Sequence, residues 1–110
     1  MSEPLVLALI AADVPDSSVR ALQAGFEEEG VPLAVERAEG ASNELGRSAA
    51  ARALLGLGIG VDPAGACAVL AAAPAASYLQ AAPADLRAFA QDAARIAGRR
   101  PLRRRPAPWV

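Results

Sequence analysis

Three consecutive carboxylates, Glu27, Glu28 and Glu29, are the residues of this chain whose types and spacing come nearest to a chemical site. They lie where a helical apolar pattern ends and an apolar, β-branched segment begins, between Gly25-Phe26 and Gly30-Val31-Pro32. The C-terminus of a helix carries partial negative charge, so each acid there costs roughly 0.3–1 kcal/mol. We therefore expect these acids to serve something other than helix stability.

The chemistry of this acidic run is open to three readings. Acids at a helix end are most often simply solvated. The carboxylates could instead pair with basic side chains of a partner, or one of them could bind a hard cation such as Mg²⁺, which prefers oxygen ligands. One carboxylate cannot build a metal site alone, so the remaining ligands would come from another chain.

The composition excludes most self-contained catalytic centres. The 110 residues carry a net charge of −1 and include neither Lys nor His. An imidazole base, a Ser-His-Asp triad, a Schiff-base lysine and a phosphate-loop lysine are therefore all excluded. The single cysteine, Cys67, cannot form an internal disulfide or a Cys-cluster metal site, and its apolar surroundings predict a buried structural thiol. We expect a chain that is not an enzyme and binds no cofactor alone.

The elements that position these residues follow from hydrophobic periodicity. Leu5–Ile10 is a continuous apolar run, typical of a buried central strand. A stripe of Val19, Leu22 and Phe26 then predicts a helix that ends at Gly30. The later segments predict strands at Val31–Val35, Leu54–Val61, Ala66–Leu70 and Ser77–Gln80, a helix over Ser42–Arg52, and a last helix from Pro83 that ends before Gly98.

This order of elements predicts one three-layer α/β/α domain over residues 1–100, followed by a basic, Pro-rich tail over residues 101–110. Right-handed crossovers make the first three strands parallel, and the turn Asp62-Pro63-Ala64-Gly65 makes the fourth antiparallel. The arginines between 99 and 105 and Trp109 are interpreted as a solvated tail or a handle for a protein partner.

Glycines alternate within the third predicted strand, at Gly56, Gly58 and Gly60. Dinucleotide binding needs its glycines in the turn between the first strand and a helix, which is not their position here. We expect them to leave one sheet face bare, so that a helix or a partner backbone can approach closely.

No targeting or membrane segment is predicted. The apolar first strand has no basic residue before it, and no apolar run approaches the ~18–20 residues of a membrane span. We expect a cytoplasmic protein that binds neither membrane nor nucleic acid.

Several short motifs are informative through their order and spacing along the chain. They are Gly25–Pro32, Ala51-Arg52 leading into Leu57–Gly60, and Ala93–Ile96 followed by Pro101–Arg103. Together they resemble the small subunit of diol/glycerol dehydratase-reactivating factors, over about residues 4–103. The first motif is similar to that family's Gly-hydrophobic-Glu-Glu-x-Gly-hydrophobic-Pro.

The chain also departs from that family at two places. Ala53–Leu55 stands where the family commonly has Ser-Pro, and Ala90–Asp92 stands where it favours Gly-x-Asn. These departures concern which dehydratase is served, and they leave the expected fold unchanged.

The resemblance implies an anticodon-binding-domain-like fold, with a five-stranded mixed sheet in the order 2-1-3-4-5 and strand 4 antiparallel. It implies a non-catalytic subunit that pairs with a large Hsp70-like ATPase subunit, which holds the ATP or ADP, commonly as a heterotetramer. Such a subunit exchanges with a subunit of an adenosylcobalamin-dependent dehydratase, so that damaged cobalamin leaves. The resemblance is also compatible with a cytoplasmic protein that associates with a bacterial microcompartment.

The resemblance also assigns roles to the acidic run. The middle acid of the family motif reaches a Mg²⁺ ion at the interface with the large subunit, and by position this acid is Glu28. Glu27 and Glu29 then flank it at the partner interface.

Two other functions remain open from the residues. A flavodoxin-like binder of a nucleotide or another small ligand would use the turn Asp13–Ser18 as a phosphate site. An anticodon-binding-like RNA module would use the C-terminal arginines. The acidic first half and the scarcity of aromatic residues disfavour RNA, because single-stranded RNA readers stack bases on aromatic rings.

Overall fold

The computed structural model describes residues 3–99, so the predicted tail and Trp109 lie outside the described residues. The elements in chain order are β1 Val6–Ala11, α1 Asp16–Glu28, β2 Ala34–Ala38, α2 Ser42–Arg52, β3 Leu57–Asp62, β4 Gly65–Leu70, β5 Ala73–Ala81, the 3₁₀ helix η1 Pro83–Asp85, and α3 Leu86–Arg99. None of the helices within residues 3–99 is both long and apolar enough to cross a membrane.

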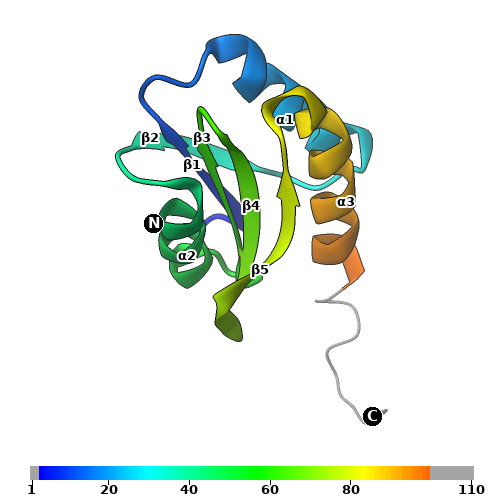
Figure 1. The fold of residues 1–110 in the computed structure, drawn as a ribbon. Helices are drawn as coiled ribbons and strands as arrows, with labels where there is room; N and C mark the ends of the chain where they lie inside the picture. Colours follow the sequence, from blue (N-terminus) through cyan, green and yellow to red (C-terminus); the bar gives the residue numbers. More distant parts are fainter. Residues whose placement is uncertain (1–2, 100–110) are drawn as a thin grey trace, which may run out of the picture.

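The strands form one five-stranded sheet in the order β2-β1-β3-β4-β5 (Figure 1). β1 pairs in parallel with β2 and β3, whereas β4 runs antiparallel to both β3 and β5. The predicted fold class is confirmed, including the antiparallel fourth strand that the tight turn after β3 requires.

Helices cover both faces of the sheet and make three layers (Figure 1). α2 packs on β1, β3 and β4 on one face, while α1 and α3 pack against each other on the other. Every residue of β1 is buried, as expected of a central strand covered on both sides. Large apolar side chains of the α1 and α3 helices, Leu22, Phe26, Leu86 and Phe89, complete the core.

The β3 glycines let α2 lie directly on the sheet. A Cβ atom added to Gly58 would stand 2.5 Å from the Gly46 carbonyl oxygen of α2, and one added to Gly60 would stand 2.9 Å from the Ser42 carbonyl carbon. Real Cβ atoms essentially never come so close to backbone. The predicted close approach of a helix backbone is therefore confirmed at Gly58 and Gly60, whereas Gly56 precedes β3 and an added Cβ atom there would meet the Ala71 side chain at 3.4 Å. Cys67 is buried on this side of the sheet as a free thiol, as predicted.

Strand β2 starts at Ala34 and not at Val31, so the prediction for this strand was wrong in its bounds. Glu36 and Arg37, which follow the predicted strand Val31–Val35, lie inside β2. β2 is an edge strand with one partner, so its side chains are partly solvated and polar residues fit there.

Both polar residues of β2 tie the edge strand to neighbouring elements. Arg37 donates hydrogen bonds to the carbonyl oxygens of Ala11 and Val14, each at 2.8 Å, beyond the end of β1. Glu36 accepts two hydrogen bonds from Arg52 of α2, at 3.1 and 2.9 Å. The hydrogen-bonded guanidinium holds the pKa of Glu36 below its ordinary value, so this pair stabilises the fold at neutral pH and loses that contribution on acidification.

Bounds differ by a residue or more at several other elements, most notably at β3, β5 and α3. β3 begins at Leu57 and not at Leu54, because Gly56 adopts a left-handed turn at φ 71° and Leu54 is 58% exposed. β5 begins at Ala73 and not at Ser77, and it includes Pro74, because an edge strand tolerates proline. Gly98 lies within α3 and does not follow it.

Candidate functional site

The acidic run lies at a well-formed helix end. α1 ends at Glu28, Glu29 is its C-cap, and the last turn contains no basic residue. Gly30 follows in the left-handed conformation with φ 73°. Its N–H donates to the Glu27 carbonyl at 3.0 Å, and the Val31 N–H donates to the Phe26 carbonyl at 3.1 Å. These two bonds form a Schellman motif, so Gly30 fixes where the helix stops.

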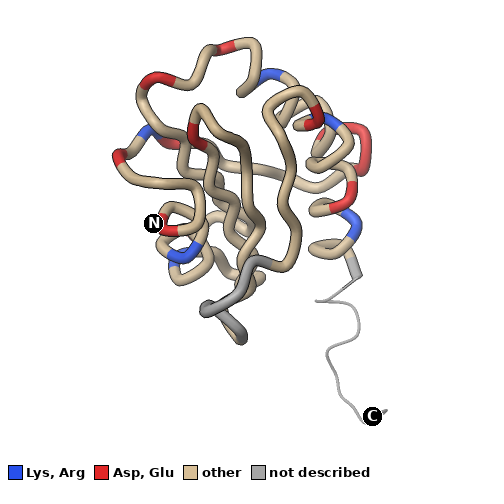
Figure 2. Tube along the Cα trace, viewed as in Figure 1, with Lys and Arg blue, Asp and Glu red and all other residues tan. Residues whose placement is uncertain are grey.

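Helix α3 supplies the cations that α1 lacks. Arg87 and Gln91 donate hydrogen bonds to the two carboxylate oxygens of Glu28, Oε2 and Oε1 respectively. Arg95 pairs with Glu29 at 3.3 Å. The three α3 residues are spaced by four and therefore share one face of the helix. Figure 2 shows this seam of opposite charges between the end of α1 and α3. We refer to it below as the α1–α3 seam.

The α1–α3 seam is held in register by tight packing beneath it. A Cβ atom added to Gly25 of α1 would stand 2.6 Å from the Arg87 carbonyl oxygen and would also collide with the Ala90 side chain. Gly25 and Phe26 are buried, as are the facing residues Phe89 and Ala90. The first glycine of the acidic motif thus sets the distance between the two helices, and that distance places Glu28 beside Arg87.

The three predicted site residues have different surroundings. The Glu28 side chain is 35% exposed and that of Glu29 is 24% exposed, and both pair with α3. Glu27 is exposed and makes no ion pair among residues 3–99. The α3 side chains offset the unfavourable charge at the helix end, although exposed pairs contribute only about 0.2–1 kcal/mol each.

No group of three or more acidic, Cys or His side chains within the described residues is arranged to hold a metal ion. The carboxylate oxygens of Glu28 are nevertheless the kind of donor that a hard cation takes. A cation bound there would need ligands beyond those that the described residues bring together.

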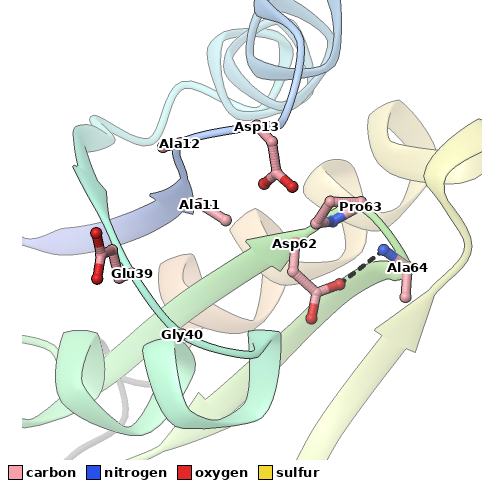
Figure 3. A pocket seen from close by; sticks show the side chains of 8 residues that line it. All are labelled: Ala11, Ala12, Asp13, Glu39, Gly40, Asp62, Pro63 and Ala64. Atoms are coloured by element: carbon pink, nitrogen blue, oxygen red, sulfur yellow. Dashed lines mark hydrogen bonds between the residues drawn. The ribbon is translucent and has the colours of Figure 1, made fainter.

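A second candidate is a pocket of about 480 Å³ beyond the carboxyl ends of β1 and β3 (Figure 3). In α/β sheets, ligands commonly bind at such a point, where the strand order reverses. Its walls carry three carboxylates, those of Asp13, Glu39 and Asp62. The Arg37 guanidinium donates hydrogen bonds to the carbonyl oxygens of Ala11 and Val14 and forms an ion pair with Asp16.

The charge and bonding of this pocket disfavour a phosphate ligand. Three carboxylates repel an anion. Asp62 is already committed to structure, because it accepts hydrogen bonds from the backbone N–H groups of Ser42 at 2.7 Å, Ala64 at 2.8 Å and Gly65 at 3.1 Å. These bonds cap α2 and close the β3–β4 turn. The geometry therefore argues against a phosphate site in this pocket, which Asp13 lines as the first residue of the turn Asp13–Ser18.

Fold and site together define a small mixed α/β protein with the sheet order 2-1-3-4-5 and a paired acidic helix end. The chain belongs to the dehydratase medium subunit family, whose model matches residues 3–103.

Two solved structures share this fold over nearly their whole length. A chain of a glycerol dehydratase reactivase aligns with a TM-score of 0.77 and 23% identity, covering 86% of this chain and 92% of that one. A chain of a diol dehydratase-reactivating factor, in complex with ADP and Mg²⁺, aligns with a TM-score of 0.75 and 22% identity, covering 89% and 94%. No curated protein is significantly similar in sequence. The predicted family resemblance and sheet order are confirmed.

Proposed function

We propose that this chain is the small, non-catalytic subunit of an ATP-dependent reactivating factor for a cobalamin-dependent diol or glycerol dehydratase. The observation that carries the proposal is the end-to-end match with two reactivase chains, which leaves 8% or less of either one uncovered. Their fold, the acidic motif and the absence of Lys and His from the chain all favour a binding role over catalysis.

In this proposal the chain binds a large Hsp70-like ATPase subunit, which carries the nucleotide. It exchanges with a subunit of the dehydratase, so that damaged cobalamin leaves and intact coenzyme enters. Exchange requires that the two exchanging chains resemble each other. Membership of a family described by a dehydratase subunit, together with reactivase-like structure, supports this requirement.

The Glu28 carboxylate is the residue that we propose as a Mg²⁺ ligand at the interface between the subunits. It is partly exposed at the end of a helix, and the remaining ligands would come from the large subunit. Glu27 and Glu29, on either side, would face the same partner. The ion, when bound, would supply an electrostatic bridge between the two chains.

Replacing Glu28 with glutamine tests this assignment. We expect Glu28→Gln to weaken the affinity for the large subunit roughly tenfold or more in Mg²⁺. Mutating a residue that is merely hydrogen-bonded to a metal ligand already lowers metal affinity or activity about 10–100-fold. Isothermal titration calorimetry with and without Mg²⁺ measures the effect. Glu39→Gln is the matched control, since it removes one exposed charge beyond the other end of the sheet and should leave the affinity unchanged. A Glu28→Gln chain that binds like wild type in Mg²⁺ would refute the role of Glu28.

A second candidate function is a subunit of a dehydratase itself, which the description of the matching family favours. Such a chain would form a stable complex with the catalytic dehydratase subunits and their cobalamin, without an ATPase.

A further inference from the structure

Both oxygens of the Glu28 carboxylate accept hydrogen bonds within its own chain. Arg87 donates to one of its oxygens and Gln91 to the other. A carboxylate held at both oxygens has a fixed orientation, and its charge is already balanced by the adjacent guanidinium. A group of another chain, or a cation, that binds Glu28 therefore meets a carboxylate that already accepts hydrogen bonds from Arg87 and Gln91.

A cation at Glu28 and the Arg87 guanidinium compete electrostatically for the same carboxylate. Mg²⁺ binds oxygen at about 2.0–2.1 Å, which would bring it within roughly 5 Å of a guanidinium bonded to the same carboxylate. Like charges at that distance, partly shielded from water by a partner chain, repel strongly. Sharing the carboxylate therefore weakens the binding of the cation, and opening the Arg87–Glu28 pair removes this penalty.

The Arg87–Glu28 ion pair can open at little cost in stability. The Arg87 side chain is 63% exposed, and its side-chain hydrogen bond within the described residues is to Glu28. An ion pair so exposed contributes little to stability, and a long arginine side chain can swing into solvent. The backbone beneath is locked by the Gly25 contact, so the side chains can open while the helices stay in place.

From these observations we infer that Arg87 and Gln91 form an intrachain clasp that competes with the partner subunit for Glu28. The clasp covers the acidic helix end in the free chain and opens when the large subunit and its cation take up the carboxylate. This inference rests on the proposed function of Glu28.

The test is a gain of affinity. Arg87→Gln should bind the large subunit in Mg²⁺ about two- to fivefold more tightly than Arg47→Gln, the range that corresponds to losing one exposed ion pair. Arg47→Gln is the control, because it removes the same charge from an exposed position on α2, outside the α1–α3 seam, and leaves Glu28 clasped. Misfolding does not produce tighter binding, and thermal unfolding of both variants verifies that the fold is intact.

The same titration on the double variant Glu28→Gln/Arg87→Gln separates the possible failures. We expect no gain from Arg87→Gln when Glu28 is absent, because coupled residues are not additive. Equal or weaker binding of Arg87→Gln relative to Arg47→Gln, alongside a weakened Glu28→Gln, would overturn the clasp and leave the proposed function standing. An unaffected Glu28→Gln would overturn the role of Glu28 itself.

Discussion

Replacing Gly60 with alanine should lower the free energy of unfolding by about 3 kcal/mol or more, at the upper end for overpacked cores. The added Cβ atom would collide with the backbone of α2 at Ser42 and Gly46. Backbone cannot rotate away as a side chain can, so α2 would have to lift from the sheet. That movement would also break the hydrogen bond from the Ser42 N–H to Asp62, which caps the helix. Urea denaturation followed by circular dichroism measures the loss.

Gly98→Ala is the matched control for Gly60→Ala. Gly98 lies inside α3, and a Cβ atom added there would meet no atom within 4 Å. Alanine is a better helix former than glycine, so this variant should be as stable as wild type or more stable by up to about 1 kcal/mol. Similar stabilities for the two variants would show that α2 does not rest on the β3 glycines as described.

Replacing Gly25 with alanine should cost about 1–3 kcal/mol and should also disconnect the α1–α3 seam. The new methyl group would press against the Arg87 carbonyl and the Ala90 side chain, pushing α3 away from α1. Glu28 and Arg87 would then lose contact. Urea denaturation reports the stability, and the NMR signal of the Arg87 side chain reports the contact.

Gly30→Ala separates this steric effect from simple destabilisation. Gly30 has a left-handed backbone, and an added Cβ atom there would touch nothing within 4 Å. Its substitution should cost about 1–2 kcal/mol through backbone strain alone. The Arg87 signal should stay unchanged in Gly30→Ala and shift in Gly25→Ala. An unchanged Arg87 signal in both variants would mean that Gly25 does not set the helix spacing.

The interior of the fold was predictable because it follows from periodicity. The continuous apolar run of β1 and the bounds of α2 follow directly from the residues. The alternating glycines of β3 predicted a close helix contact before the helix that makes it was known. These features depend on near neighbours in sequence and on burial on both faces, and each leaves a clear pattern.

The sheet edges were less predictable because their pattern depends on which strand lies outermost. Glu36 and Arg37 resemble loop residues, and they occur in β2 because one side of that strand is open to solvent. Pro74 resembles a strand terminator, and β5 accommodates it because an edge strand need not donate every backbone hydrogen bond.

The candidate site was only half predictable. The sequence locates Glu27, Glu28 and Glu29 and the unfavourable charge at their helix end. It does not reveal that Arg87 and Gln91 donate hydrogen bonds to Glu28 and so offset that charge. These two residues lie 59 and 63 positions from Glu28 in the sequence, and their register depends on the Gly25 contact. The one available signal was the spacing by four of Arg87, Gln91 and Arg95 along α3.

The central claim is that this chain is the small subunit of a dehydratase reactivase, and isolation of the tagged chain from its native host in Mg²⁺ tests it most directly. Mass spectrometry then identifies the bound proteins. We expect a near-stoichiometric Hsp70-like ATPase subunit, with dehydratase subunits in smaller amounts. A stoichiometric complex with catalytic dehydratase subunits and no ATPase, or recovery of neither, would contradict the claim.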